Sequence, residues 1–356
     1  MAGHSGDITG AAWSCAIPAG NVLRVFFACG FVCLLYMMTG MTVPLLFDQQ
    51  LIRQHRQRAS RHYADFAFLK DAAAARLADR LELIRRDFDL CLDLGAHDGR
   101  LAQLFAQQFA QDSAQDSVGD SAGSGKIGHM IQSDPAVGFA LAAAGHGSGI
   151  AHALDHLPYK AESFDAVFSC LSLHWVDDLP GLMMQALHLL KPDGLLLLSL
   201  LGGNSLIELR QVLAEAEQDI TGGLSPRCAP MADIRDIGGL LSRAGLALPV
   251  ADSDRLTVNY PHMFKLMADL RGMGEQNALL ARLKTPTRRD VFYLAAEIYQ
   301  QRFGQADGQI PASFEIVTVT GWAPHESQQK PLRPGSAAQR LATVLESDEK
   351  DPETGV

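Results

Sequence analysis

The sequence has few cysteines, and its acidic residues outnumber its basic ones. The six cysteines form no Cys-x-x-Cys pair, so their spacing indicates neither a zinc site nor a disulfide framework and favours a reducing compartment. They are Cys15, Cys29, Cys33, Cys91, Cys170 and Cys228. The net charge of −10 argues against a nucleic-acid-binding protein, which needs a basic face. Small molecules or proteins are therefore the expected partners.

Long hydrophobic runs are also absent, with one exception near the N-terminus. Residues 25–47 contain 23 positions without a charge, enough to span a bilayer as a helix. Four arginines follow the run and would keep the rest of the chain on the cytoplasmic side; they are Arg53, Arg56, Arg58 and Arg61. The alternative is a natural start at Met41. We therefore expect a cytoplasmic protein that is either peripheral to the inner membrane or anchored in it.

Beyond this run the composition is globular, with 47% hydrophobic and 20% charged residues. Apolar runs predict strands at 88–95, 126–134, 164–175 and 194–203. Helical spacing predicts helices at 99–110, 135–145 and 179–190, preceded by one or two helices within 51–86. Strands that alternate with helices indicate an α/β protein with a mainly parallel sheet covered on both faces. A Ser/Asp/Gly-rich run at 111–125 is expected to be a mobile surface insertion.

The stretch LCLDLGAHDGRLA, residues 90–102, reads as a buried strand, a tight glycine turn and a helix. Glycines in such a turn let backbone N–H groups and the helix N-terminus approach an anion. The stretch resembles the D-x-G-x-G-x-G turn of class I S-adenosylmethionine-dependent methyltransferases. The resemblance implies that Asp93, Gly95, Ala96, His97 and Gly99 hold S-adenosylmethionine. It also implies a seven-stranded Rossmann-like sheet.

His97 stands where that pattern has its middle glycine. A histidine fits there if its φ is negative and its ring turns outward, where it would line the cofactor pocket. We therefore expect His97→Gly to preserve or strengthen cofactor binding, and Asp93→Ala and Gly95→Val to abolish it.

Further candidate residues follow the next strands, at the carboxyl edge of the expected sheet. The methyltransferase resemblance implies that Asp134 accepts hydrogen bonds from both ribose hydroxyls, and Asp134 is also placed to cap the next helix. The acidic residue expected near the adenine falls at Ala153, so Asp155 is the candidate substitute. The stretch 169–181, at the end of the strand predicted at 164–175, brings further candidate residues to this edge. It contains Leu171 as a cofactor contact and His174 and Trp175 as catalytic candidates bordering the sulfonium or the substrate.

The second half of the chain resembles a narrower family. The stretches 202–227, 236–246, 252–277 and 307–331 are similar to the mitochondrial complex I assembly factor 5 family and its bacterial relatives. The similarity extends from about Leu46 to Ala337. It implies a methyltransferase-like fold and hydroxylation of an arginine in the iron–sulfur subunit of complex I, so that subunit is the expected protein partner.

The pattern of this half also predicts structure. Residues 246–260 read as a strand or hairpin and 312–322 as a strand, which together would form the antiparallel end of the sheet. Helices predicted at 261–283 and 288–303 would cover the carboxyl edge and recognise the protein substrate. Its polar candidates are Arg227, Tyr260, Arg271 and Glu275, of which Tyr260 is also a catalytic candidate.

Five segments summarise the expected organisation. They are a hydrophobic segment at 1–43, helices at 44–87, the S-adenosylmethionine-binding core at 88–203, a C-terminal half with a helical insertion at 204–337, and a disordered acidic tail at 338–356.

The residue pattern favours methyl transfer over oxygen chemistry. None of the twelve histidines starts a His-x-Asp/Glu motif, the usual beginning of the iron-binding facial triad, and we assign no metal ligand. Methyl transfer needs chiefly proximity and orientation. Three functions remain open: a methyltransferase-like enzyme that hydroxylates an arginine of complex I and assists its assembly, a carboxyl O-methyltransferase acting on a small molecule or on the carrier protein of biotin synthesis, and a non-catalytic assembly chaperone.

Overall fold

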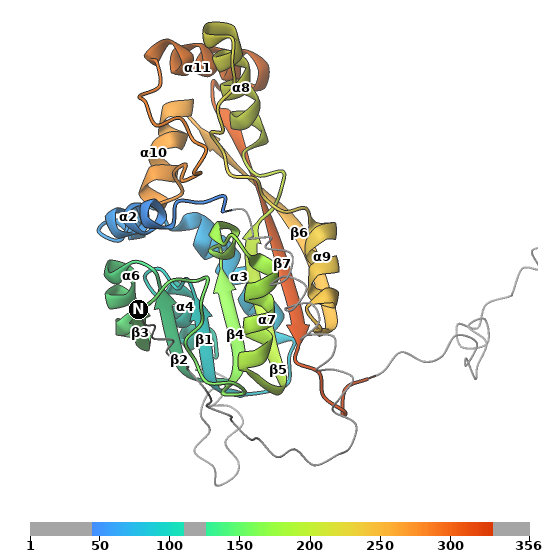
Figure 1. Ribbon diagram of the computed structural model, residues 1–356. Coiled ribbons are helices and arrows are strands. Elements are labelled where there is room, and N and C mark those ends of the chain that lie inside the picture. Colours follow the sequence, from blue (N-terminus) through green and yellow to red (C-terminus); the bar gives the residue numbers. More distant parts are fainter. Residues whose placement is uncertain (1–44, 110–125, 330–356) are drawn as a thin grey trace, which may run out of the picture. The chain divides into compact units, whose positions relative to one another are not determined.

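The computed structural model describes residues 45–109 and 126–329 (Figure 1). The acidic tail, most of the apolar run at 25–47 and all of the Ser/Asp/Gly-rich run at 111–125 therefore lie outside the described residues. Within the described ranges, no helix is long and apolar enough to cross a membrane.

A seven-stranded sheet with the order β3-β2-β1-β4-β5-β7-β6 forms the centre of the fold. Its strands are β1 (Phe88–Leu94), β2 (Ile127–Asp134), β3 (Ser148–Ala151), β4 (Phe164–Cys170), β5 (Leu190–Leu201), β6 (Ala247–Tyr260) and β7 (Ile310–Trp322). The first five strands pair in parallel, whereas β7 is antiparallel to both β5 and β6. The expected mainly parallel sheet and its antiparallel end are thus confirmed.

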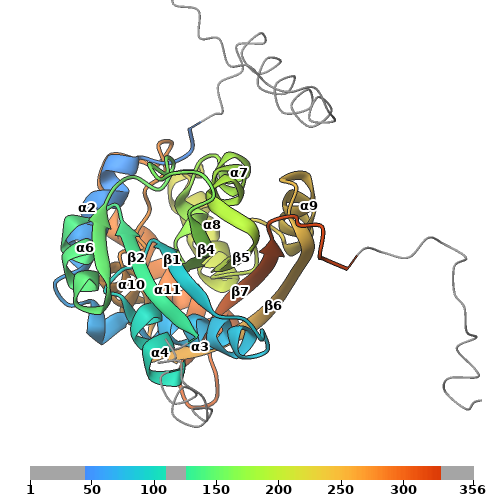
Figure 2. The ribbon, with the colours of Figure 1, turned by 90° about the horizontal axis from the view of Figure 1, so that it is seen from below.

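Helices pack on both faces of this sheet, as the alternating pattern predicted. The helices within the described ranges are α2 (Gln49–Ala59), α3 (Phe68–Glu82), α4 (Arg100–Phe109), α6 (Val137–Ala143), α7 (Leu179–Leu189), α8 (Ile207–Thr221), α9 (Ile234–Arg243), α10 (Met263–Met273) and α11 (Arg289–Phe303), with short 3-10 turns η1 (Tyr63–Phe66), η2 (Ala144–His146) and η3 (Leu173–Trp175). Figure 2 shows α3 and α4 on one face and α7 and α9 on the other. Leu195 and Leu197 pack with the first pair and Leu196 and Leu198 with the second, because successive side chains of a strand alternate between faces.

The ribbon of β6 and β7 continues past the carboxyl edge of the parallel strands. Pairing of β7 with β5 ends at Ile316, whereas its pairing with β6 continues to Ile310. The extension carries α8, α10 and α11 (Figure 1). The helix predicted over 261–283 was too long: α10 ends at Met273, because Gly274 adopts φ +86° and closes the helix as a left-handed cap.

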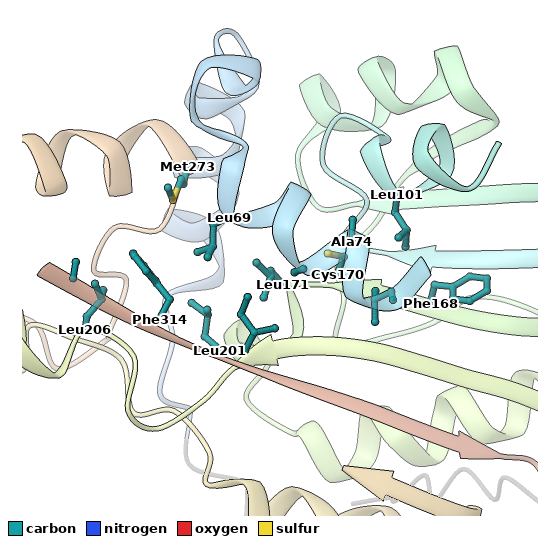
Figure 3. Close-up of a cluster of buried hydrophobic side chains, with 14 of the residues drawn as sticks. Leu69, Ala74, Leu101, Phe168, Cys170, Leu171, Leu201, Leu206, Met273 and Phe314 are labelled. Atoms are coloured by element: carbon teal, nitrogen blue, oxygen red, sulfur yellow. The ribbon is translucent and has the colours of Figure 1, made fainter. Parts of the chain in front are cut away.

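A shared hydrophobic cluster joins this extension to the sheet. Figure 3 shows Leu69 of α3 and Met273 of α10 near Leu171 and Leu201, at the ends of β4 and β5, with Phe314 of β7 beside them. All five side chains are buried. The cluster therefore fixes the extension against the carboxyl edge, where ligands of open α/β sheets bind.

Candidate functional site

The strand order reverses direction between β1 and β4, which pair with each other at the middle of the sheet. The chain leaves β1 toward β2 and β3 on one side, whereas it leaves β4 toward β5 on the other. Such a reversal opens a crevice outside the carboxyl ends of the two strands. The loops that follow them, beginning at Gly95 and Leu171, therefore form the candidate site.

Gly95 is held tightly against the loop after β4. Its φ is +74°, and a Cβ built on it would lie 2.2 Å from the Cβ of Ser172. The Ser172 hydroxyl donates to the Gly95 carbonyl at 2.8 Å, and the Gly95 N–H donates to the carbonyl of Ser133 at 2.8 Å. Glycine is thus required here by both conformation and space. Gly99 also has a positive φ, +84°, as the sequence motif implies.

His97 does not take the conformation expected from the sequence. Its φ is +54°, so it occupies the left-handed region of the glycine it replaces, and its ring is buried rather than turned outward. The ring stacks on Tyr63, with ring centroids 5.0 Å apart, and meets the edge of Phe139. The expectation of a negative φ and an outward ring was wrong, because this apolar pocket and a buried cation draw the imidazole inward.

That cation is Lys70 of α3, which lies fully inside the protein at 2% exposure. Its ammonium reaches the carbonyls of Gly95 and Ala96, each at 3.0 Å, and Nδ1 of His97 at 2.7 Å. Each of the three N–H donors of the Lys70 ammonium thus has an acceptor. Burial and the neighbouring positive charges of Arg56 and Lys70 hold the pKa of His97 well below its usual value. Nδ1 also lies 2.9 Å from the Gly95 carbonyl, which can only accept, but Lys70 and Arg56 both present donors to Nδ1. We therefore assign Nδ1 as the acceptor and place the proton on Nε2.

Asp134 at the end of β2 is fully buried and paired with Arg56 of α2. Arg56 bridges both carboxylate oxygens, through Nε at 3.2 Å to Oδ1 and through its terminal nitrogen to Oδ2. The backbone N–H groups of His97 and Ala136 donate to the same carboxylate at 3.1 and 2.9 Å. Asp134 therefore links the loop after β1, the start of α6 and helix α2.

Asp93 differs from Asp134, because neither of its carboxylate oxygens has a hydrogen-bond partner among the described residues. Burial raises the pKa of Asp93 to about 6, although the charge of Lys70 acts in the opposite direction. Keeping an unsatisfied carboxylate inside a protein is costly, so such groups are candidates for ligand binding.

We expect Asp93→Asn to stabilise the protein above about pH 6. In the unfolded state the carboxyl of Asp93 has a pKa near 3.8. Between this pH and about 6, the folded state therefore holds a proton that the unfolded state has lost. The free energy of unfolding falls as the pH rises through this range. The substitution removes this penalty, which amounts to at most about 3 kcal/mol at roughly 1.4 kcal/mol per pKa unit. Urea denaturation near pH 8 and near pH 5 measures the gain, which should shrink at the lower pH.

Asp89→Asn is the matched control, because Asp89 lies exposed on the same strand. It should show no gain that depends on pH. A variant Asp93→Asn that is less stable than the parent near pH 8 would contradict the assignment of Asp93 as an unsatisfied carboxylate.

The catalytic candidates His174 and Trp175 both contact Glu275, which follows α10. The Oε2 atom of Glu275 lies 3.0 Å from Nε2 of His174 and accepts from the Trp175 indole N–H at 2.7 Å. Burial opposes ionisation of Glu275, but the hydrogen bonds of His174 and Trp175 and the charges of His174 and Arg56 outweigh it and lower its pKa. The site thus contains a carboxylate that is kept ionised.

Two hollows lie beside these groups. The larger, about 670 Å³, lies under α2 and is bounded by Pro135, residues 151–154 and Trp175. The smaller, about 20 Å³, is lined by His97, Leu171, His174 and Glu275 among others. Ala96 is buried within the loop after β1 and borders neither hollow. Asp155 borders neither hollow, and its Oδ1 has no partner among the described residues.

Three other sequence candidates lie apart from this cluster. Tyr260 ends β6 on the extension, where it pairs with Ile310 and is buried, so it does not join His174 and Trp175. Arg227 forms a two-pronged ion pair with Glu217. Arg271 lines a separate hollow of about 380 Å³, together with Ala59 at the end of α2.

Sequence reasoning missed Lys70 and Arg56 as site residues. Lys70 carried a detectable signal, because it shares a helix face with Ala73, Ala74 and Leu77 and is a single charge on that apolar stripe. Arg56 appeared only as one of four basic residues after the apolar run. No group of three metal-binding side chains occurs within the described ranges.

The fold and the turn after β1 define a methyltransferase-type domain. A family model described as a methyltransferase domain matches residues 61–249, and the chain belongs to this family. It also belongs to the family of the Homo sapiens protein named arginine-hydroxylase NDUFAF5, mitochondrial. The two chains are 36% identical over 333 residues, which cover 91% of this chain and 90% of the human one.

Two other similarities were found. The malonyl-[acyl-carrier protein] O-methyltransferase of Laribacter hongkongensis (strain HLHK9) is 29% identical over 83% of this chain and 96% of its own. Among solved structures, the YcgJ protein of Bacillus subtilis aligns over 70% of this chain and 98% of its own, with a TM-score of 0.47 and 13% identity.

Proposed function

We propose that this protein binds S-adenosylmethionine at the carboxyl edge of its sheet and hydroxylates an arginine of the iron–sulfur subunit of complex I, as part of complex I assembly. The observation that carries the proposal is the similarity to the human arginine hydroxylase along nearly the full length of both chains. The substrate subunit is the protein partner, and the protein works on the side of the inner membrane where that subunit is assembled.

The residues at this edge fit S-adenosylmethionine. The N-terminus of α4 and the glycine turn suit its carboxylate, Asp134 stands where ribose hydroxyls need an acceptor, and the larger hollow has room for the adenine. The unsatisfied Asp93 carboxylate is available to the amino group. When bound, S-adenosylmethionine supplies a sulfonium-activated methyl group. Arg56 is an obstacle to this arrangement, because it already pairs with both oxygens of the Asp134 carboxylate.

The acceptor side suits a cationic side chain. Glu275 is ionised and its side chain retains 14% exposure beside the smaller hollow, and a carboxylate is the natural partner of a guanidinium. His174 and Trp175 hold Glu275 from one side. We therefore assign Glu275 to orienting the substrate arginine, with His174 and Trp175 as its positioning residues.

A second candidate function is carboxyl O-methylation of a carrier-protein substrate, favoured by the similarity to the Laribacter hongkongensis enzyme over most of both chains. Its acceptor is anionic, so the ionised Glu275 disfavours it electrostatically.

Mass spectrometry of the complex I iron–sulfur subunit from a deletion strain tests the proposal. The subunit arginine should lack the mass of one oxygen atom, and the wild-type gene should restore it. Glu275→Gln should restore it only weakly because the guanidinium loses its charged partner, whereas Glu326→Gln, on the exposed loop after β7, should restore it fully. Hydroxylation needs an oxidant that S-adenosylmethionine does not supply, so whole cells are used. An unchanged arginine together with a biotin requirement would favour the second function.

A further inference from the structure

Arg56 divides the space that a nucleoside cofactor would need to occupy. Its side chain lines the larger hollow under α2, and its terminal nitrogen lies 3.2 Å from Nδ1 of His97, which lines the smaller hollow. Asp134 lies between the two regions and borders neither hollow, because the guanidinium covers both of its oxygens. An extended molecule reaching from the adenine region to the turn after β1 would meet Arg56 on its way.

We propose that Arg56 is a latch, which must leave Asp134 before the ribose hydroxyls of S-adenosylmethionine or S-adenosylhomocysteine can bind there. This inference rests on the proposed function, because it takes Asp134 as the ribose acceptor. The ion pair and the cofactor compete for the same two carboxylate oxygens, so the closed latch lowers the apparent affinity for the cofactor.

The surroundings of Asp134 allow the latch to open. A buried carboxylate that loses its only partner is strongly destabilised. Asp134 keeps the N–H groups of His97 and Ala136 when Arg56 departs, so its charge stays hydrogen-bonded. Ribose hydroxyls would then replace the two guanidinium donors, and the number of hydrogen bonds to the carboxylate would be conserved.

Helix α2, which carries the latch, is held in place at both of its ends. The N–H groups of Leu46 and Phe47 donate to Asp177, and Asp48 forms an ion pair with Arg282. Near Arg56 the helix contacts α6 through a hydrogen bond from the Gly138 N–H to the Gln57 side chain and through Phe139, whose ring lies under the Arg56 guanidinium. Ala59 is buried in the same cluster as Phe139. These contacts hold the backbone of α2 in place beside α6 (Figures 1 and 2), so the latch opens by movement of the Arg56 side chain away from Asp134.

The test is calorimetric binding of S-adenosylhomocysteine to the full-length protein and to matched variants. Arg56→Met keeps an unbranched, flexible side chain and removes the guanidinium with its charge, so we expect about tenfold tighter binding. Arg53→Met is the control, since Arg53 lines the same hollow but is exposed and has no contact with Asp134. Arg56→Lys retains the charge but cannot bridge both oxygens, and should bind with intermediate affinity.

Thermal unfolding provides a second readout. Without ligand, Arg56→Met should melt below the wild type because Asp134 loses its counterion, and S-adenosylhomocysteine should raise its melting temperature by more than that of the wild type. Weaker binding by Arg56→Met than by wild type would overturn the latch and make Arg56 a cofactor contact, with the proposed function intact. No binding by the wild type or any variant would overturn both the latch and the cofactor assignment of the proposed function.

Discussion

Gly95→Val is expected to destabilise the protein by about 3–5 kcal/mol and to abolish cofactor binding. Gly95 has φ +74°, a conformation that a β-branched residue adopts only under strain. Its added Cβ would lie 2.2 Å from that of Ser172, and both residues belong to buried loops that cannot separate without breaking their mutual hydrogen bond. The free energy of unfolding from urea titration and the calorimetric affinity for S-adenosylhomocysteine measure the two losses.

Gly145→Ala is the matched control for this prediction. Gly145 lies exposed in η2, and no atom lies within 4 Å of a Cβ built on it. Its substitution should change the free energy of unfolding by less than about 1 kcal/mol. A Gly95→Val variant as stable as Gly145→Ala would mean that the loops after β1 and β4 are not packed as described.

Much of the fold could be predicted because its signals are local. Runs such as Phe88–Leu94 are short, apolar and followed by turn residues, and the alternation with helices indicates parallel pairing. The predicted boundaries of helices and strands were wrong where a single residue determines them. Gly274 ends α10 in the middle of a helical pattern. Strand β5 begins at Leu190 rather than at the predicted residue 194, with Asp193 at φ +63° inside it.

The candidate site was predictable only in part, for the same reason. Asp93, Gly95 and Asp134 lie at strand ends, which a sequence pattern can locate. Lys70 is 25 positions from Gly95, and Arg56 is 78 positions from Asp134. Periodicity shows which face of a helix is buried but not which loop it meets, so the two cations that hold the site together remained hidden.

These cations also reverse the expected effect of His97→Gly. The glycine motif alone predicts that this substitution preserves or strengthens cofactor binding. In the structure it would relieve about 1 kcal/mol of left-handed strain, but it would remove a ring packed between Tyr63 and Phe139 and one of three acceptors of the Lys70 ammonium. Losing a buried ring and leaving a buried donor unsatisfied outweigh the relief, so we expect a net loss of about 3 kcal/mol in unfolding free energy and weaker binding of S-adenosylhomocysteine.

The pH dependence of this loss of stability shows whether the imidazole acts as a hydrogen-bond acceptor or only fills space. The pKa of His97 is depressed chiefly by burial, so the unfolded state takes up a proton below about pH 6.5 that the folded state refuses, and wild-type stability falls on acidification. The His97→Gly variant has no imidazole at this position, so acid does not destabilise it in this way. The difference in unfolding free energy between wild type and variant should therefore be largest above about pH 7 and smaller toward pH 5. His156→Gly, which removes an exposed ring, should show neither effect. Tighter cofactor binding by His97→Gly would support the prediction made from the glycine motif. A loss of stability that becomes smaller at acidic pH would instead identify His97 as a neutral acceptor that Lys70 requires.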